Sequence, residues 1–339
     1  MTRWTEGIYE TACYRLARGG ELSRAKLAYL HAGTLDSDGR NAVLVTHGYT
    51  TGHHFVLPDS LAAEGSWSEL VGPGRAIDTN RFFVVSSNAL GSCYGSSGPA
   101  SIDEAVSTQY SEAFPAVTFE DTIRLQYQLL RSLGVKHLHA VAGPSMGGIQ
   151  ALQWGVQFPD FVSRLVVAVS GLKSPAKRDG EREALARKIR ALPAWRNGNP
   201  EAGAMIPWLV EQRVRTLRTY SMDDYLREQG ISESEVDAQL QGLAAKWAEK
   251  FHPWSLVVLA QAIDEFGVMD KLSLIRSKVF LALCANDQIF PASEGPASVE
   301  LLRSAGVDAQ YFEIPSRYGH LASGLDWDKW EGPLRSFLD

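Results

Sequence analysis

The chain has 339 residues, of which 45% are hydrophobic and 21% are charged, and its formal net charge at pH 7 is −6. This composition is ordinary for a globular protein, and a chain of this length can hold one large α/β domain with an insertion, or two domains of average size. The acidic balance gives no electrostatic reason to expect nucleic acid or an anionic membrane as a partner, and no apolar run approaches the ~18 residues of a membrane-spanning helix.

The N-terminal segment 1–20 lacks the continuous apolar stretch of a secretory signal peptide. The three cysteines, Cys13, Cys93 and Cys284, are far apart and show no C-x-x-C spacing. Disulfide bonds and a cysteine-based zinc framework are therefore not expected, and a reducing cytoplasm is the expected location.

Short apolar runs alternate with amphipathic segments along the chain. The segment 119–134 has apolar residues at helical spacing, with Thr118 as N-cap and Gly134 as C-terminal stop, and a second helix is predicted over 146–158. The runs predicted as strands cover residues 24–33, 42–48, 81–88, 137–143, 164–170, 278–284 and 309–314. Apolar strands separated by helices indicate an α/β protein with a mostly parallel central sheet flanked by helices.

Residues 172–268 break this alternation. They are rich in Arg, Glu, Trp and Ala and are punctuated by prolines, which predicts a helical insertion, while 1–171 and 269–339 together form the core domain. The tryptophans of the insertion are Trp195, Trp208, Trp247 and Trp254. Their apolar faces are expected to roof a site at the carboxyl edge of the sheet, as a lid, or to meet a second copy of the chain.

Residues 143–147 read GPSMG and fit the pattern G-x-S-x-G between a predicted strand and a predicted helix. The pattern alone is weak, because a glycine-rich turn can be purely structural. Its context favours a nucleophile elbow, in which small neighbours let a tight turn close around a serine. Ser145 is therefore the candidate nucleophile, and the helix that follows directs the positive end of its dipole at the site.

A serine hydroxyl needs a base, and in this type of fold a carboxylate and a histidine follow the serine in that order. Asp287 lies just past the predicted strand 278–284, and His320 lies on the loop after 309–314. Asp287 could instead be an ordinary turn residue, and His320 a loop histidine without a role. Because the members of the ordered set each lie at a strand end, the sequence favours a catalytic triad.

The segment THGYTTGHHF (46–55) directly follows a predicted strand, where this type of fold places half of its oxyanion hole. The backbone N–H groups of Tyr49 and Met146 are expected to face the substrate oxyanion. His47 and Gly48 are expected to shape the turn.

The adjacent histidines His53 and His54 raise the question of a metal ion. Two adjacent side chains on a strand point apart, and no third ligand is evident in the sequence. We therefore expect packing or solvent-facing roles for both histidines, with no metal and no cofactor.

Several stretches resemble the homoserine O-acetyltransferase family of the α/β-hydrolase fold over nearly the whole chain. They read YLHAGTLDSDGRNAVLVTHGYTTG, NALGSCYGSSGPAS, TIRLQYQLLRSLGVKHLHAVAGPSMGGIQALQWGVQFPD, ANDQIFP and YGH, and the Gly/Ser-rich second one is particularly specific. The resemblance implies a nucleophile, a triad acid and a triad base at Ser145, Asp287 and His320. It also implies oxyanion donors at Tyr49 and Met146, and a helical lid that often builds a dimer interface.

Two positions depart from the family pattern. Members that use homoserine typically carry an aspartate directly after the triad histidine, where it receives the substrate's amino group, and this position is Leu321 here. Residues 250–255 read KFHPWS and lack the acidic residue that such members have in this segment. The residues expected to line the substrate pocket are Gly48, Thr50 and Leu321. The candidates to meet a carboxylate are Arg213, Arg215 and Arg218, among which the sequence does not choose.

The first functional expectation is a serine carboxylic-ester hydrolase that cleaves short acyl esters, such as acetates of small uncharged alcohols. Leu321 offers no partner to an ammonium group, and an apolar wall cannot by itself exclude water. The alternative is an acyl-CoA-dependent O-acyltransferase with a hydroxyl acceptor, and a third is an inactive fold used for binding. The expected partners are a small-molecule ester, or acetyl-CoA for the transferase, and a second copy of the chain joined through the lid.

Overall fold

The computed structural model describes residues 2–60, 62–63, 65–175, 181–198 and 200–339. Residues 176–180 and 199 of the predicted insertion lie outside the described residues. Within the described part of the chain, every helix is too short or too polar to cross a lipid bilayer.

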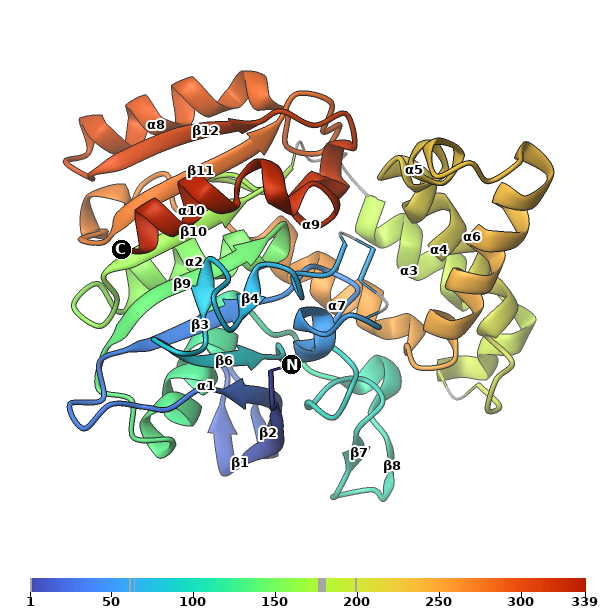
Figure 1. The fold of residues 1–339 in the computed structure, drawn as a ribbon. Helices are drawn as coiled ribbons and strands as arrows, with labels where there is room; N and C mark the ends of the chain where they lie inside the picture. Colours follow the sequence, from blue (N-terminus) through green and yellow to red (C-terminus); the bar gives the residue numbers. More distant parts are fainter. Residues whose placement is uncertain (1, 61, 64, 176–180, 199) are drawn as a thin grey trace.

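A single eight-stranded sheet forms the centre of the molecule (Figure 1). In spatial order its strands are β1 (Thr5–Arg15), β2 (Glu21–Ala32), β6 (Phe83–Ser87), β3 (Ala42–Thr46), β9 (Leu138–Pro144), β10 (Arg164–Ala168), β11 (Lys278–Cys284) and β12 (Ala309–Ile314). The pairs β1–β2 and β2–β6 are antiparallel, and every pair from β6 to β12 is parallel. The predicted mostly parallel α/β fold is confirmed.

Helices cover both faces of this sheet because alternate strand residues are apolar on both sides. In β3, Leu44 faces one core cluster, whereas Val43 and Val45 face the other. The first cluster holds α1 (Phe119–Ser132), α2 (Met146–Gln157) and α8 (Gly295–Ser304), and the second holds α9 (Ala322–Leu325) and α10 (Glu331–Leu338).

Local sequence signals fix the ends of α1 as predicted. The Thr118 side chain accepts a hydrogen bond from Asp121 N, and the Asp121 carboxylate accepts one from Thr118 N, which forms a capping box. The helix ends at Ser132, and Gly134 follows with a φ of 89°, a conformation that favours glycine.

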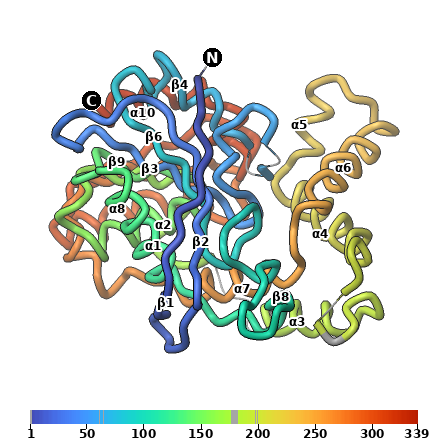
Figure 2. The backbone as a smooth tube through the Cα atoms, turned by 90° about the horizontal axis from the view of Figure 1, so that it is seen from below, coloured from blue at the N-terminus to red at the C-terminus, as the bar shows by residue number. Residues whose placement is uncertain are grey.

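The chain between β10 and β11 is helical. It contains α3 (Glu181–Arg190), η3 (Pro193–Gly198), α4 (Ile206–Thr219), α5 (Met222–Glu228), α6 (Glu233–Ala248) and α7 (Pro253–Asp264). Figures 1 and 2 both place α4, α5 and α6 to one side of the sheet, whereas most apolar residues of α7 belong to the first core cluster. The bounds 172–268 for a lid stay a prediction.

Short elements complete the fold. They are η1 (His53–Val56), β4 (Val71–Gly72), β5 (Ile77–Asp78), β7 (Ile102–Asp103), β8 (Thr108–Gln109), η2 (Ser111–Ala113), η4 (Leu272–Leu274), η5 (Ala292–Glu294), η6 (Gly319–Leu321) and η7 (Trp327–Lys329). Of these, η1 and η6 bear on the sites described below, because they carry His53, His54 and His320.

Candidate active site

Ser145 occupies a strained turn between β9 and α2. Its φ is 54° and its ψ is −122°, a backbone conformation that non-glycine residues rarely adopt. The turn is held because Ser145 N donates a hydrogen bond to Ala168 O at 2.9 Å. A Cβ atom on Gly143 or Gly147 would lie 2.4 Å from an oxygen of Thr46, so both positions need glycine. This is the geometry of a nucleophile elbow.

The predicted acid and base are in direct contact. His320 Nδ1 lies 2.8 Å from Asp287 Oδ2, and both side chains are buried. The other carboxylate oxygen, Asp287 Oδ1, accepts hydrogen bonds from Ile289 N at 2.8 Å and Phe290 N at 3.1 Å. Because the carboxylate holds a proton on Nδ1, the tautomer of His320 carries its lone pair on Nε2, as a general base requires.

Strand topology brings these groups to one edge of the sheet. Ser145 follows β9, Asp287 follows β11 and His320 follows β12, and these parallel strands end at the same carboxyl edge. Parallel sheets bind ligands at this edge. The arrangement can therefore combine a nucleophile with an oriented base.

A tyrosine that the sequence did not single out packs on His320, the predicted base. The ring of Tyr220, at the C-terminal end of α4, lies 4.5 Å from the His320 ring, centroid to centroid. The ring of Phe290 lies 6.2 Å away. Tyr220 and Leu217 also pack with Leu321, so helix α4 covers this side of the carboxyl edge near His320.

The turn after β3 lies where the oxyanion hole was predicted. His47 Nδ1 donates to Gly48 O at 2.7 Å, and burial lowers the pKa of His47 to about 4, so this imidazole stays neutral. Tyr49 Oη donates to Leu256 O at 2.5 Å, which ties the turn to α7. Among the described residues, no backbone carbonyl accepts a hydrogen bond from the N–H of Tyr49 or Met146.

A cavity of about 310 Å³ lies between this turn and the helical insertion. Its lining residues are Tyr49, Thr50, Leu185, Gln212, Arg213, Arg215, Thr216, Thr219, Tyr220, Trp247 and Leu256. It meets the catalytic edge through Tyr49, a predicted oxyanion donor, and Tyr220, which packs on His320. An acceptor molecule of a few carbon atoms would fit in this volume.

The structure separates the three arginines that the sequence could not rank. Arg213 is 3% exposed, donates from Nη1 to Thr50 Oγ1 at 2.5 Å, and lies over the Trp247 ring with Cζ 4.8 Å from its centroid. Arg215 forms an ion pair with Glu211, and Arg218 forms one with Asp237, both at exposed positions. Arg213 is therefore the buried cation of this cavity.

Of the three residues predicted to line the substrate pocket, Gly48, Thr50 and Leu321, one lines this cavity. Thr50 lines the cavity, and its carbonyl oxygen accepts a hydrogen bond from Trp247 Nε1 at 2.8 Å. Gly48 and Leu321 are not among the described residues that line it. Leu321 is fully buried against the insertion instead. Trp247, one of the tryptophans expected to roof the site, lines the cavity as well. Tyr220 was missed, because only its aromatic character marks it in the sequence.

The histidine pair does not have the geometry expected of a strand. His53 and His54 lie at the start of the helix η1, and both rings turn toward the carboxylate of Glu6 on β1. The expectation that their side chains point apart was therefore wrong, because a helical turn does not alternate side chains as a strand does. Within the described residues, this is the group in which three potential metal-ligand atoms gather.

The sequence matches the α/β hydrolase fold family over residues 41–325. A homoserine O-acetyltransferase from Geobacter sulfurreducens is 34% identical over 347 residues, which cover 96% of this chain and 94% of that relative.

Two solved structures share the fold. Esterase E22 superposes with a TM-score of 0.88 at 23% identity, covering 99% of this chain and 100% of that one. A homoserine O-acetyltransferase from Bacillus anthracis superposes with a TM-score of 0.88 at 24% identity, covering 100% and 98%. The fold is thus shared with one protein named as an esterase and with one named as an acetyltransferase.

Proposed function

Because the chain belongs to the homoserine O-acetyltransferase family of the α/β-hydrolase fold, we propose that it transfers an acyl group through Ser145 to a small hydroxyl acceptor. The observation that carries this proposal is the 2.8 Å contact between His320 Nδ1 and Asp287 Oδ2, at the sheet edge where Ser145 occupies a strained elbow. These residues supply a nucleophile, a base and a group that orients the base.

The first half-reaction places the acyl group on the enzyme. His320 Nε2 takes the hydroxyl proton of Ser145 while Oγ attacks the carbonyl carbon of an acyl thioester or ester. The N–H groups of Tyr49 and Met146 hold the oxyanion that forms. Collapse of this intermediate breaks the bond to the leaving thiol or alcohol, which receives the proton from His320.

The second half-reaction removes the acyl group. The acceptor hydroxyl gives its proton to His320 and attacks the acyl carbon, and the ester bond to Ser145 Oγ breaks as that oxygen recovers a proton. A transferase differs from a hydrolase only here, because it must hold an alcohol where water would otherwise react.

The cavity favours an acceptor that carries a carboxylate. The described residues that line it include two arginines and no aspartate or glutamate. The guanidinium of Arg213 is buried and held between Thr50 and Trp247, a fixed position from which it can pair with a carboxylate. An ammonium group would find no carboxylate among these lining residues. The proposed acceptor is therefore a small hydroxy acid.

Ester hydrolysis is the second candidate, and one observation favours it. Leu321 fills the position at which homoserine-using relatives typically carry an aspartate, and it is buried in the contact with the insertion. An acceptor that cannot be held securely leaves the acyl-enzyme open to water, which then yields free acid.

The experiment that separates these outcomes supplies acetyl-CoA with homoserine, with γ-hydroxybutyrate, or with no acceptor. γ-Hydroxybutyrate is homoserine without its amino group, so the pair tests the ammonium alone. We expect acetylated γ-hydroxybutyrate to form faster than O-acetylhomoserine or free acetate, as measured by mass spectrometry. Free acetate as the main product in all three reactions would support the hydrolase. No release of CoA, and no cleavage of a simple acetate ester, would contradict both.

A further inference from the structure

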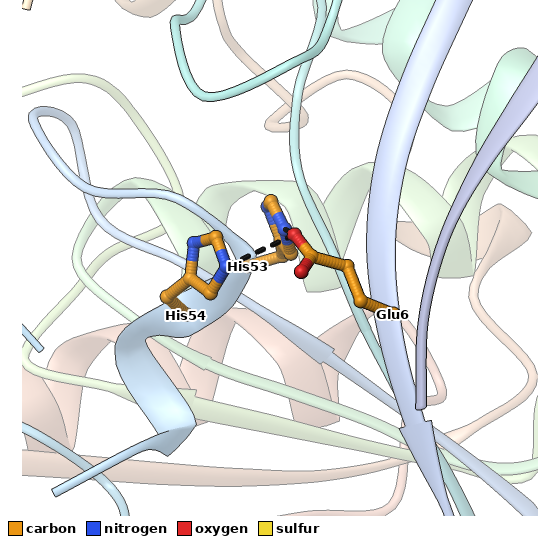
Figure 3. A group of neighbouring side chains, drawn as sticks. All are labelled: Glu6, His53 and His54. Atoms are coloured by element: carbon orange, nitrogen blue, oxygen red, sulfur yellow. Dashed lines mark hydrogen bonds and ion pairs between the residues drawn. The ribbon is translucent and has the colours of Figure 1, made fainter. Parts of the chain in front are cut away.

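Three potential metal ligands converge on η1, just after the turn that carries Tyr49, which we call the oxyanion turn. Figure 3 shows Glu6 reaching from β1 toward the rings of His53 and His54 on η1. Glu6 Oε1 lies 3.2 Å from His53 Nε2 and 3.1 Å from His54 Nε2. One ligand atom from each of the three residues lies within 4.8 Å of the other two. Both histidines thus present the same ring nitrogen to one carboxylate oxygen.

We propose that Glu6, His53 and His54 bind one divalent transition-metal cation of the zinc class. Ligand atoms bound at ~2.0–2.2 Å to a tetrahedral zinc ion lie about 3.3–3.5 Å apart, close to the two observed N–O separations. A cation could therefore replace the two hydrogen bonds after small side-chain movements. Two imidazoles with one carboxylate suit zinc, whereas Mg²⁺ prefers a shell of oxygen ligands.

Two of the three ligand groups, His53 and Glu6, have the ionisation states that such a cation needs. Burial lowers the pKa of His53 to about 4, so its imidazole is neutral near pH 7. The hydrogen bond with His53 is the main cause that lowers the pKa of Glu6, whose carboxylate is therefore ionised. Metal ions bind neutral imidazole and ionised carboxylate. Each Nε2 now donates a hydrogen bond to Glu6 Oε1, so its proton would move to Nδ1 of the same ring when the cation binds.

The surroundings leave room for a fourth ligand. A cavity of about 630 Å³ is lined by Glu6 and His54, together with Thr51, Gly52 and Tyr94. Zinc sites with three protein ligands complete their shell with water or another small ligand. The open side of the proposed site faces this cavity, and we expect a water molecule or a small anion at the fourth position.

A cation here would join two distant parts of the chain. Glu6 belongs to the edge strand β1, and His53 lies 47 residues later, just after the turn that carries Tyr49. Binding to the folded protein alone stabilises it by mass action, so the melting temperature should rise with metal concentration. The proposed role is to fasten β1 to the segment that follows the oxyanion turn, without a step in acyl transfer.

The test titrates full-length protein with Zn²⁺ and Mg²⁺ by calorimetry, after treatment with EDTA. All proteins carry Cys13→Ser, because Cys13 is an exposed thiol that could itself bind zinc. Glu6→Gln keeps an oxygen acceptor but removes the charge, and His54→Gln removes one imidazole. His137→Gln is the matched control, because His137 directly precedes strand β9 and its Nε2 contacts Ser163 Oγ at 2.7 Å, away from the proposed site.

We expect one Zn²⁺ per chain, no comparable Mg²⁺ binding, and a higher melting temperature with Zn²⁺ than with EDTA. Removal of a residue that only hydrogen-bonds to a metal ligand weakens metal binding about 10–100-fold. Glu6→Gln and His54→Gln change direct ligands, so each should weaken Zn²⁺ binding at least tenfold. His137→Gln should bind as the parent protein does. The spectrum with Co²⁺ should show the intense visible bands of four-coordinate geometry.

Zn²⁺ binding that is absent in the parent protein, or equal in Glu6→Gln, His54→Gln and His137→Gln, would overturn the proposal. The melting temperature in EDTA shows whether each variant is folded. Glu6→Gln keeps the test valid if His54→Gln does not fold, because the Glu6 side chain is 59% exposed.

Discussion

Single contacts fix the properties of two histidines, the buried His320 and the half-buried His252. Asp287 sets the tautomer of His320 through one hydrogen bond, and its second oxygen is held by two backbone N–H groups. His252 accepts a hydrogen bond from Trp254 N at 3.2 Å and so caps α7, a helix of the main core. The Asp287–His320 contact should therefore affect the reaction rate, and the contact of His252 with Trp254 N should affect the stability of the fold.

Asp287→Asn should lower kcat by roughly 10³–10⁴-fold, because an amide can hold the wrong tautomer of His320. The rate is measured with an acetate ester and with acetyl-CoA. Asp326→Asn is the control, since Asp326 is a buried carboxylate that pairs with Lys329 at 2.9 Å, and it should keep near-normal kcat. A kcat for Asp287→Asn within tenfold of the wild type would contradict the role of Asp287.

His252→Asn should reduce the loss of stability in acid. Burial lowers the pKa of His252 from 6.5 to about 4, so between these values the unfolded chain binds a proton that the folded chain does not. The free energy of unfolding therefore falls as the pH decreases through this window, by at most about 1.4 kcal/mol per pH unit from this residue.

Asparagine keeps an N-cap acceptor for Trp254 N and does not titrate. Urea unfolding at pH 7 and pH 5 should thus show a decrease in the free energy of unfolding that is up to about 2 kcal/mol smaller in His252→Asn than in the wild type. An unchanged difference between the two pH values would show that His252 is protonated in the folded protein as readily as in the unfolded chain.

At the scale of elements, long apolar runs were predictable and weak or short ones were not. The predicted strands 278–284 and 309–314 match β11 and β12. Strand β11 was predictable because a buried parallel strand is a continuous apolar run. The strand β1 was missed, since it is an antiparallel edge strand with mostly exposed residues. For the same reason Glu6 was not recognised as a partner of His53, which lies far along the chain.

The elbow depends on close contact between α2 and the end of β3. Gly147→Ala would place Cβ 2.4 Å from Thr46 O, a backbone atom that cannot move alone. We expect a loss of about 1–3 kcal/mol in the free energy of unfolding, together with a fall in kcat as Ser145 shifts.

Gly242→Ala in α6 is the matched control for this helix position. A Cβ atom on Gly242 meets nothing within 4 Å, and the helix should gain about 0.5–1 kcal/mol in stability. Equal effects of the two substitutions on stability and on kcat would contradict the packing argument.

For the whole molecule, the sequence predicted that the candidate site lies at the carboxyl edge of the sheet. It did not predict which residues of the helical insertion contact that edge. Only the folded insertion places Arg213 beside Thr50 and leaves Arg215 and Arg218 at exposed positions. Trp195, Trp247 and Trp254 are buried within the chain, so they offer no exposed patch to a second copy. A dimer through the lid stays a prediction.

Arg213→Lys tests the contact between the insertion and the core. Lysine keeps the charge but loses the planar fork that pairs with a carboxylate, so KM for a hydroxy-acid acceptor should rise roughly tenfold or more. The rate of acyl-enzyme formation should change less than this KM. Arg218→Lys, at an exposed ion pair with Asp237, is the control. An equal rise in both variants would contradict a carboxylate site at Arg213.

The central claim, that the acyl group passes through Ser145, is tested most directly by finding that group on the enzyme. The protein is mixed with acetyl-CoA or an acetate ester without an acceptor, quenched in acid, digested and analysed by mass spectrometry. The account predicts one acetyl group on the peptide that contains Ser145, and neither adduct nor turnover in Ser145→Ala. An acetyl group on another residue, or turnover by Ser145→Ala at the wild-type rate, would contradict it.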